Sequence, residues 1–205
     1  PLAPRLKGLE PYIKNYHMED MSHQFREEQV WDANWKCLVE NFMEGYHLSF
    51  THYKTLHDVT PTRLCKKVLG GKSYTGFKSH YPEKWPRREP HHADLTDEEQ
   101  RYTMMFCIYP SHVVALTPDL VNFMCIKPTG MAQLQTTWGL ATYESKPNNK
   151  IVINLRNWIG QVMFEDKKRL EGQKNGLSSQ LSDVGTLAPS DLEGTLWDIN
   201  RYLID

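Results

Sequence analysis

Two histidines with two glutamates just upstream could do chemistry in the stretch ENFMEGYHLSFTH, residues 40–52. His47 and His52 lie five positions apart, and Glu40 and Glu44 precede them. Imidazole nitrogens and carboxylate oxygens are common ligands of divalent metals. The same residues could also form the solvent-exposed polar face of an amphipathic helix. The residue types alone leave both interpretations open.

The surrounding pattern predicts a helix over residues 31–56, with apolar residues on one stripe and the glutamates and His47 on the opposite one. A solvated face usually mixes charges of both signs, whereas this stripe is acidic plus histidine. His52 lies about 140° around the helix from His47. Both can therefore face one ion only if the helix ends or distorts between them. Ser49 and Thr51 lie at that point, and their hydroxyls compete for backbone hydrogen bonds.

A carboxylate also falls on the apolar face of a second predicted helix, residues 151–177. Asp166 shares its row with Met163 and Leu170, which belong to the expected core. A buried carboxylate without a partner is costly, so it neutralises or finds a partner. A metal cation and a structural salt bridge are both possible partners. Glu165, next to it, is interpreted as an ordinary flanking residue.

Two imidazoles and one carboxylate together suit a ferrous ion. They occupy one side of its coordination sphere and leave positions open for oxygen and substrate. The histidine spacing alone is a weak signal. Its combination with a carboxylate on the core row of a distant helix makes a site at His47, His52 and Asp166 a stronger hypothesis.

The other elements must position these residues. Residues 57–101 predict a long loop region with one or two short strands. Residues 103–145 contain short β-branched and aromatic runs separated by turn signals, which is typical of an antiparallel meander. Residues 190–203 predict a final helix, and residues 1–30 predict a connector or an edge strand. This order indicates an α+β domain with helices on one face of an antiparallel sheet.

The segment NWKCLVENFMEGYHLSFTH, residues 34–52, resembles the catalytic-domain signature of the Rieske non-heme iron oxygenases, the aromatic-ring-hydroxylating dioxygenase alpha-subunit family. The family pattern has N-W-K, then E-N, then an acidic residue two places before Tyr-His, and a second His five positions later. FEDKKRLEGQKNGL, residues 164–177, is similar to the second block of the family, in which an Asp leads a helix bearing Glu and Gln. The resemblance covers roughly residues 1–205.

The resemblance implies His47, His52 and Asp166 as the ligands of a mononuclear Fe(II). It implies that Glu44 occupies the acidic position that links the iron site to a histidine of the Rieske cluster on a neighbouring subunit. Many ring dioxygenases have Asp there, and Glu also occurs in oxygenases that demethylate quaternary amines. Asn41 is expected in the same region, where it would orient a ligand or a water molecule.

The same resemblance implies cofactors and partners beyond this chain. Family members carry a Rieske [2Fe-2S] cluster on C-x-H and C-x-x-H motifs, and neither motif occurs in this sequence. The expectation is that residues 1–30 connect to a missing N-terminal Rieske domain and that residues 31–205 form the catalytic domain; the alternative is that the cluster lies on another chain. Electrons would come from NAD(P)H through a separate reductase or ferredoxin. The expected assembly is a homotrimer that acts with O2 on an aromatic compound or a quaternary amine, by ring hydroxylation or oxidative demethylation.

The implied fold is a helix-grip, START-like fold, in which a curved antiparallel sheet wraps around a long C-terminal helix and leaves a cavity. From strand alternation alone, we expect inward-facing residues of the meander around Met105, Cys107, Val114 and Phe123 to line that cavity. Plain core packing of these residues is the alternative.

The composition limits the other function classes. A net charge of -1 gives no electrostatic reason to expect nucleic acid or an anionic membrane as a partner. No apolar run approaches the roughly 20 residues that span a bilayer. The four cysteines lack metal-binding spacing, and we expect a cytoplasmic location.

Two rival functions remain from the sequence. One is a non-enzymatic helix-grip domain that binds a small molecule and needs no metal. The other is a zinc hydrolase, against which the absence of H-E-x-x-H counts.

Overall fold

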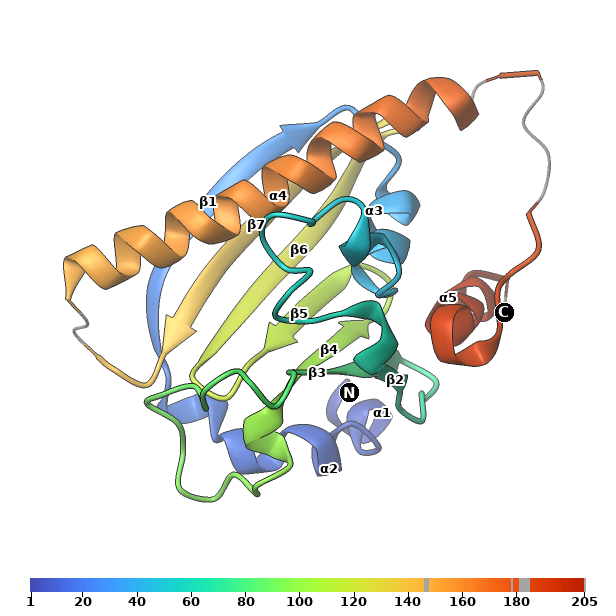
Figure 1. Cartoon of the computed structure of the whole chain (residues 1–205). Coiled ribbons are helices and arrows are strands. Elements are labelled where there is room, and N and C mark those ends of the chain that lie inside the picture. Colours follow the sequence, from blue (N-terminus) through green and yellow to red (C-terminus); the bar gives the residue numbers. More distant parts are fainter. Residues whose placement is uncertain (146–147, 178, 181–184, 205) are drawn as a thin grey trace.

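The computed structural model describes residues 1–145, 148–177, 179–180 and 185–204 (Figure 1). The strands are β1 (Ser22–Trp31), β2 (Cys65–Lys67), β3 (Tyr74–His80), β4 (Tyr102–Ile108), β5 (His112–Leu116), β6 (Leu120–Gly130) and β7 (Gln133–Thr142). The α-helices are α1 (Ala3–Leu6), α2 (Glu10–Ile13), α3 (Trp35–Phe42), α4 (Asn149–Leu177) and α5 (Ser190–Ile204). Short 3-10 helices are η1 (Lys14–Tyr16), η2 (Met18–Asp20), η3 (His47–Ser49), η4 (Thr62–Leu64) and η5 (Glu99–Arg101).

The strands form one 7-stranded antiparallel sheet in the order β1-β7-β6-β5-β4-β3-β2. From β2 to β7 each strand pairs with the next one in the chain, which confirms the predicted meander. β1 pairs with β7 at the edge of the sheet. Residues 1–30 predict a connector or an edge strand, and Ser22–Trp31 form the edge strand. The two short strands in the loop region are β2 and β3.

The long helix α4 crosses one face of the sheet, as Figure 1 shows. Ile159, Met163 and Leu170 are buried on it and belong to the same core cluster as Trp31 and Trp138 of the sheet. Burial of such side chains stabilises the fold by about 1.5–3 kcal/mol each. A curved antiparallel sheet around a long helix near the C-terminus is the helix-grip arrangement, so the expected α+β fold is confirmed.

The opposite face of the sheet is also covered, which the sequence did not predict. Along β4, Tyr102, Met104 and Phe106 belong to a second core cluster, whereas Cys107 belongs to the first. Leu9 and the other apolar residues around α1, α2 and η1 pack against this second cluster. The expectation that helices lie on one face only is therefore wrong. The nearly continuous apolar run of β4 is the sequence signature of a strand buried on both faces.

The first predicted helix is much shorter than residues 31–56. Asn34 caps α3 by accepting a hydrogen bond from the backbone N–H of Lys36 at 2.9 Å. The helix ends at Phe42, and turns and η3 carry the chain onward. The helix therefore ends before both histidines, so the condition that allows His47 and His52 to face one point is met.

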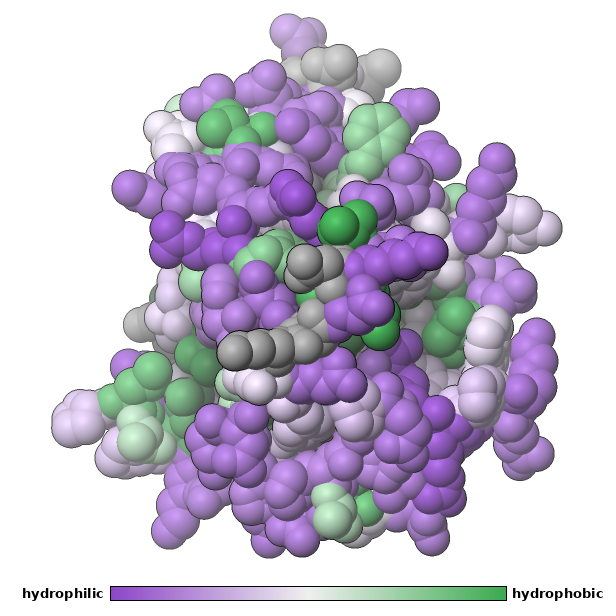
Figure 2. Space-filling view, turned by 90° about the vertical axis from the view of Figure 1, so that its left-hand side faces the viewer, coloured by the Kyte–Doolittle hydropathy of each residue, from purple (hydrophilic) through white to green (hydrophobic). Residues whose placement is uncertain are grey.

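The surface is mostly polar on the side shown in Figure 2, where hydrophobic residues appear in small separate patches. Within the described ranges, no helix combines the length and the apolar character needed to cross a membrane. The longest, α4, carries charged side chains along much of its length.

Candidate active site

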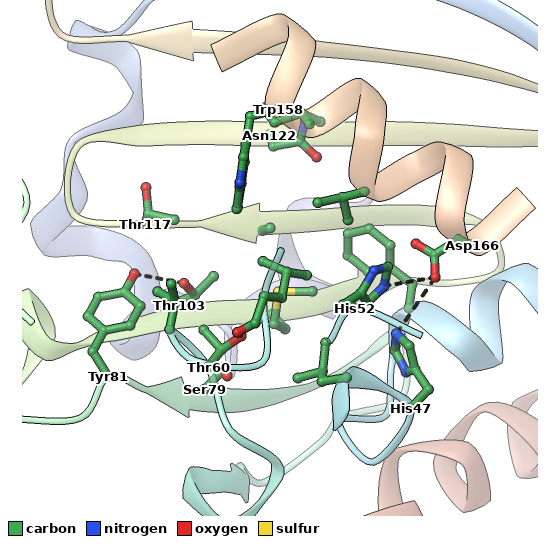
Figure 3. Close-up of a pocket in the computed structure, with 18 of the residues that line it drawn as sticks. His47, His52, Thr60, Ser79, Tyr81, Thr103, Thr117, Asn122, Trp158 and Asp166 are labelled. Atoms are coloured by element: carbon green, nitrogen blue, oxygen red, sulfur yellow. Dashed lines mark hydrogen bonds and ion pairs between the residues drawn. The ribbon is translucent and has the colours of Figure 1, made fainter. Parts of the chain in front are cut away.

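His47, His52 and Asp166 meet at one point between η3, the following turn and α4 (Figure 3). Nε2 of His52 lies 3.0 Å from Oδ1 of Asp166, and Nε2 of His47 lies 3.7 Å from the same oxygen. One donor atom from each residue lies within 4.8 Å of the others. His52 is 1% exposed and Asp166 is 9% exposed. Three potential ligands thus meet at one position, although His47 and Asp166 are 119 residues apart along the chain.

The other nitrogen of each imidazole is held by a carboxylate. Nδ1 of His47 contacts Oε1 of Glu44, and Nδ1 of His52 lies 2.8 Å from Oε2 of Glu165. Such a contact fixes the tautomer and the ring orientation, and it raises the basicity of the other nitrogen. Both Nε2 atoms are therefore presented toward Asp166 as ligands. This donor set, with its held outer nitrogens, fits a ferrous ion.

Glu44 is itself fixed by the backbone. Its Oε2 accepts hydrogen bonds from the N–H groups of Tyr46 at 2.5 Å and His47 at 3.1 Å. The carboxylate is 6% exposed. These bonds also explain the end of the helix, because the Glu44 side chain satisfies N–H groups that a continuing helix would pair with the backbone.

Asn41 lies beside Asp166. Its Nδ2 donates a hydrogen bond of 2.9 Å to Oδ1 of Asp166. The amide thus holds the carboxylate oxygen that faces the histidines. The expected role for Asn41, orienting a ligand, has a structural basis in this contact.

Glu165 is the residue that the sequence interpretation missed. Besides His52, its carboxylate accepts hydrogen bonds from Thr55 at 2.7 Å and Gln161 at 3.0 Å. Successive residues of a helix are rotated by about 100°, so the side chain of Glu165 points in a different direction from that of Asp166. Glu165 faces the turn that bears His52 and Thr55. The spacing of residues within the helix gives no sign of this contact.

The pKa of His52 reflects these neighbours. Burial lowers the pKa of His52, but the hydrogen bonds and charges of Asp166 and Glu165 outweigh burial and raise it. Burial raises the pKa of Glu165, and its contacts with His52, Gln161 and Thr55 outweigh burial and lower it. The site therefore attracts positive charge, which either a proton or a metal cation can supply.

A second group of the same residue types lies at the surface. His17, Asp20 and His92 also bring donor atoms within 4.8 Å of one another, but Asp20 is exposed and neither histidine is fully buried. Nε2 of His17 is engaged by Asp94 at 2.8 Å. Burial distinguishes the first group from this one.

A cavity of about 170 Å³ lies beside the three residues, between α4 and the sheet. Much of its wall is apolar, formed by side chains that include Phe42, Leu48, Phe77, Met105 and Ile159. Trp158 lines it and is 42% exposed, so the cavity lies close to the surface there.

The four residues expected around this cavity divide between the two faces of the sheet. Met105 lines the cavity as expected, and Cys107 is buried core on the same face. The expectation is wrong for Val114 and Phe123, which line a space under the N-terminal helices on the other face. Alternation along a strand leaves open which set of side chains faces the cavity, and Val114 and Phe123 belong to the set that faces the N-terminal helices.

A sequence profile of the ring hydroxylating alpha subunit, catalytic domain, matches residues 12–205. No curated protein sequence matches the chain.

Several solved structures share the fold. The quaternary ammonium Rieske monooxygenase CntA superposes with a TM-score of 0.79 at 15% identity, over 100% of this chain and 55% of that one. Naphthalene 1,2-dioxygenase does so with a TM-score of 0.70 at 14% identity, over 99% of this chain and 59% of that one. NdmB from Pseudomonas putida CBB5 has a TM-score of 0.60 at 16% identity, over 91% and 50%.

The chain spans little more than half the length of the first of these proteins. At such identities, the superpositions show a shared fold alone. The profile match covers most of the sequence, including both motif segments. The family expected from residues 34–52 and 164–177 is thereby confirmed, and the chain belongs to the ring hydroxylating alpha subunits, within their catalytic domain.

Proposed function

We propose that this chain is the catalytic domain of a Rieske-type oxygenase, which uses Fe(II) and O2 to oxidise a small organic molecule in the cavity. The observation that carries the proposal is the convergence of His47, His52 and Asp166 beside an apolar cavity. Ferrous iron in this donor set would supply open coordination positions at which dioxygen is activated.

The residues of this chain have distinct tasks in the proposal. Glu44 and Glu165 keep the proton of each imidazole on Nδ1, so that Nε2 stays available as a ligand. Asn41 holds Asp166 in place through its amide. The apolar wall excludes water and positions the substrate carbon next to the site.

Electrons must come from outside the described site. We propose that a Rieske [2Fe-2S] cluster on another domain or chain supplies them, fed by NAD(P)H through a reductase, and that Glu44 lies on the route within a homotrimer. Glu44 supports this role because its carboxylate touches His47 and is anchored to the backbone. All four cysteines are free, which fits a reducing compartment such as the cytoplasm.

The reaction is proposed as insertion of oxygen into an aromatic compound or a quaternary amine. The matching family is that of ring hydroxylating subunits, and the structural neighbours include a quaternary ammonium monooxygenase and a naphthalene dioxygenase, which supports keeping both substrate classes in the proposal.

The test is anaerobic reconstitution with ferrous iron, followed by metal analysis. We expect about one iron per chain in the wild type and at least a tenfold loss of affinity in Asp166→Ala and His47→Ala, because each variant removes a direct ligand. Asp58→Ala is the matched control, since it removes an exposed carboxylate outside the site and should leave iron binding unchanged. Equal iron binding by Asp166→Ala and the wild type would instead indicate a non-enzymatic helix-grip domain that binds a small molecule.

A further inference from the structure

The cavity has an apolar section and a polar section, which follow from the register of the strands. Phe77 pairs with Met105 and Met105 pairs with Ala115, so these three side chains form one row across β3, β4 and β5. The next row on the same face consists of Ser79 and Thr103, which pair across β3 and β4, and of Thr117, which directly follows β5. All six residues line the cavity.

The polar section lies at the end of the cavity that is far from the three potential ligands. Figure 3 shows Tyr81, Thr103 and Thr117 on one side of the view and Asp166, His47 and His52 on the other. The hydroxyls of Tyr81 and Thr103 are 2.7 Å apart. One of these two hydroxyls donates to the other, so the pair retains a further donor hydrogen for a ligand.

Arg88 forms part of the same wall and is the only lysine or arginine among the cavity-lining residues in the part of the chain that the structure describes. Its Nε and Nη2 donate to the two carboxylate oxygens of Asp119, at 2.5 and 3.1 Å. Asp119 is held in turn by the hydroxyl of Thr117 at 2.7 Å and is not among the lining residues. Arg88 thus lines the cavity, while its counter-ion Asp119 lies outside the cavity lining.

Arg88 retains hydrogen-bonding capacity. A guanidinium has five N–H donors, and Nη1 of Arg88 has no acceptor within the described ranges. Burial lowers the pKa of Arg88, but Asp119 raises it more, so the group stays charged. Burial raises the pKa of Tyr81 to about 12, so its hydroxyl remains a donor at neutral pH.

We propose that this end of the cavity binds a carboxylate and that the substrate is an aryl or alkyl carboxylic acid. The carboxylate accepts hydrogen bonds from Nη1 of Arg88 and from the Tyr81–Thr103 hydroxyl pair, while the apolar body lies along Phe77, Met105 and Ala115 toward His47, His52 and Asp166. A charged guanidinium N–H donor beside a phenol suits a carboxylate, because hydrogen bonds between charged partners are the stronger ones. The same charge disfavours a quaternary ammonium group at this end, so the substrate classes proposed above narrow to acids.

The identity of the substrate rests on the proposed function, but the binding site does not. The test therefore measures binding rather than turnover, by titration calorimetry on the full chain. The probes are 3-phenylpropionate, 3-phenylpropionamide and phenethyltrimethylammonium, which share an aryl group and differ in charge. We expect the acid to bind at least about tenfold more tightly than the amide, as for a hydrogen bond to a charged group, and the ammonium ion to bind weakest.

Three variants separate recognition from folding. Arg88→Gln should weaken the acid about tenfold or more and the amide less than about twofold, and Tyr81→Phe should weaken the acid by a smaller factor. Asp119→Asn removes the counter-ion and leaves the charge of Arg88 unopposed, so it should tighten the acid and leave the amide unchanged. A merely structural Arg88–Asp119 pair would make Arg88→Gln and Asp119→Asn weaken all probes alike, and that result would overturn the proposal.

The proposal is also wrong if the amide or the ammonium ion binds as well as the acid, or if none of the three probes binds. Asp166→Ala distinguishes this failure from failure of the proposed function. It should lose iron yet keep the preference for the acid, because Arg88 and Asp119 make no contact with Asp166 in the structure.

Discussion

Individual carboxylates decide where the two imidazoles of the site point. Glu44 contacts one ring and Glu165 the other, and each leaves the opposite nitrogen facing Asp166. A histidine pair without these contacts could rotate away from a shared point. The orientation of the rings therefore carries as much information as their proximity.

Removal of Glu165 should weaken metal binding without removing a ligand. In Glu165→Ala, His52 loses the acceptor of its Nδ1–H, and we expect Fe(II) affinity to fall about 10- to 100-fold, the usual range for such outer contacts. An anaerobic Fe(II) titration measures it. Gln161→Ala, which removes only a neighbour of the Glu165 carboxylate, should change affinity far less. Unchanged affinity in Glu165→Ala would show that the ring is held by packing alone.

At the scale of elements, the sequence predicted the helices and strands that show a clear local pattern of apolar residues. The apolar spacing of residues 151–177 predicts α4, and the carboxylate at position 166 stands out because it interrupts that spacing. The strands of the meander follow from β-branched runs and turn signals. These signals are local, so a single sequence carries them.

Other features depended on contacts between distant residues. The helix α3 ends early because the Glu44 side chain takes the N–H groups of Tyr46 and His47. Glu165 acquires its partner 113 residues away in sequence. The N-terminal layer uses α1 and α2, each only 4 residues long, which is too short to show a helical period. Three-dimensional neighbours, rather than local propensity, determine these features.

The strand β5 offers a test of the pH dependence of stability. Burial lowers the pKa of His112, which begins β5 and lines the space under α1 and α2. Its folded-state pKa lies below the unfolded value near 6.5, so the unfolded state binds more protons as the pH falls. The stability contributed by neutral His112 is present above the unfolded pKa and decreases as the pH falls from there through the folded pKa.

We expect the free energy of unfolding of His112→Gln to decrease less between pH 7.5 and pH 5 than that of the wild type. Urea denaturation at several pH values measures the difference. Parallel pH profiles for His112→Gln and the wild type would rule out a role for His112.

On the scale of the whole molecule, the site brings together residues from distant parts of the chain. The residues after α3 supply two histidines, and α4 supplies the carboxylate from near the C-terminal end. The helix α5 packs over the same region, where the hydroxyl of Tyr46 donates to Glu193 at 2.8 Å. A cation at the site would link these regions in the folded state only.

Metal binding should therefore raise thermal stability. A ligand present at about 100 times its Kd stabilises the folded state by about 2.7 kcal/mol, which corresponds to about 5–10 °C in Tm for a chain of this length. Differential scanning fluorimetry under anaerobic conditions, with and without ferrous iron, measures the shift. Asp166→Ala should show less than about 1 °C of shift at the same iron concentration. An equal shift in both proteins would place the stabilising ion elsewhere.

The burial of β4 on both faces has a consequence for how substrate preference can diversify. Thr103 and Met105 face the cavity, whereas Met104 and Phe106 face the N-terminal layer. The sheet thus separates the cavity from the N-terminal layer, so the side chains on one face can change without altering the packing on the other. A combinatorial library at Thr103, Met105 and Ala115 can reshape the cavity while the packing beneath α1 and α2 stays intact. Evolution has the same freedom, so the inherited scaffold can accept new substrates one wall residue at a time.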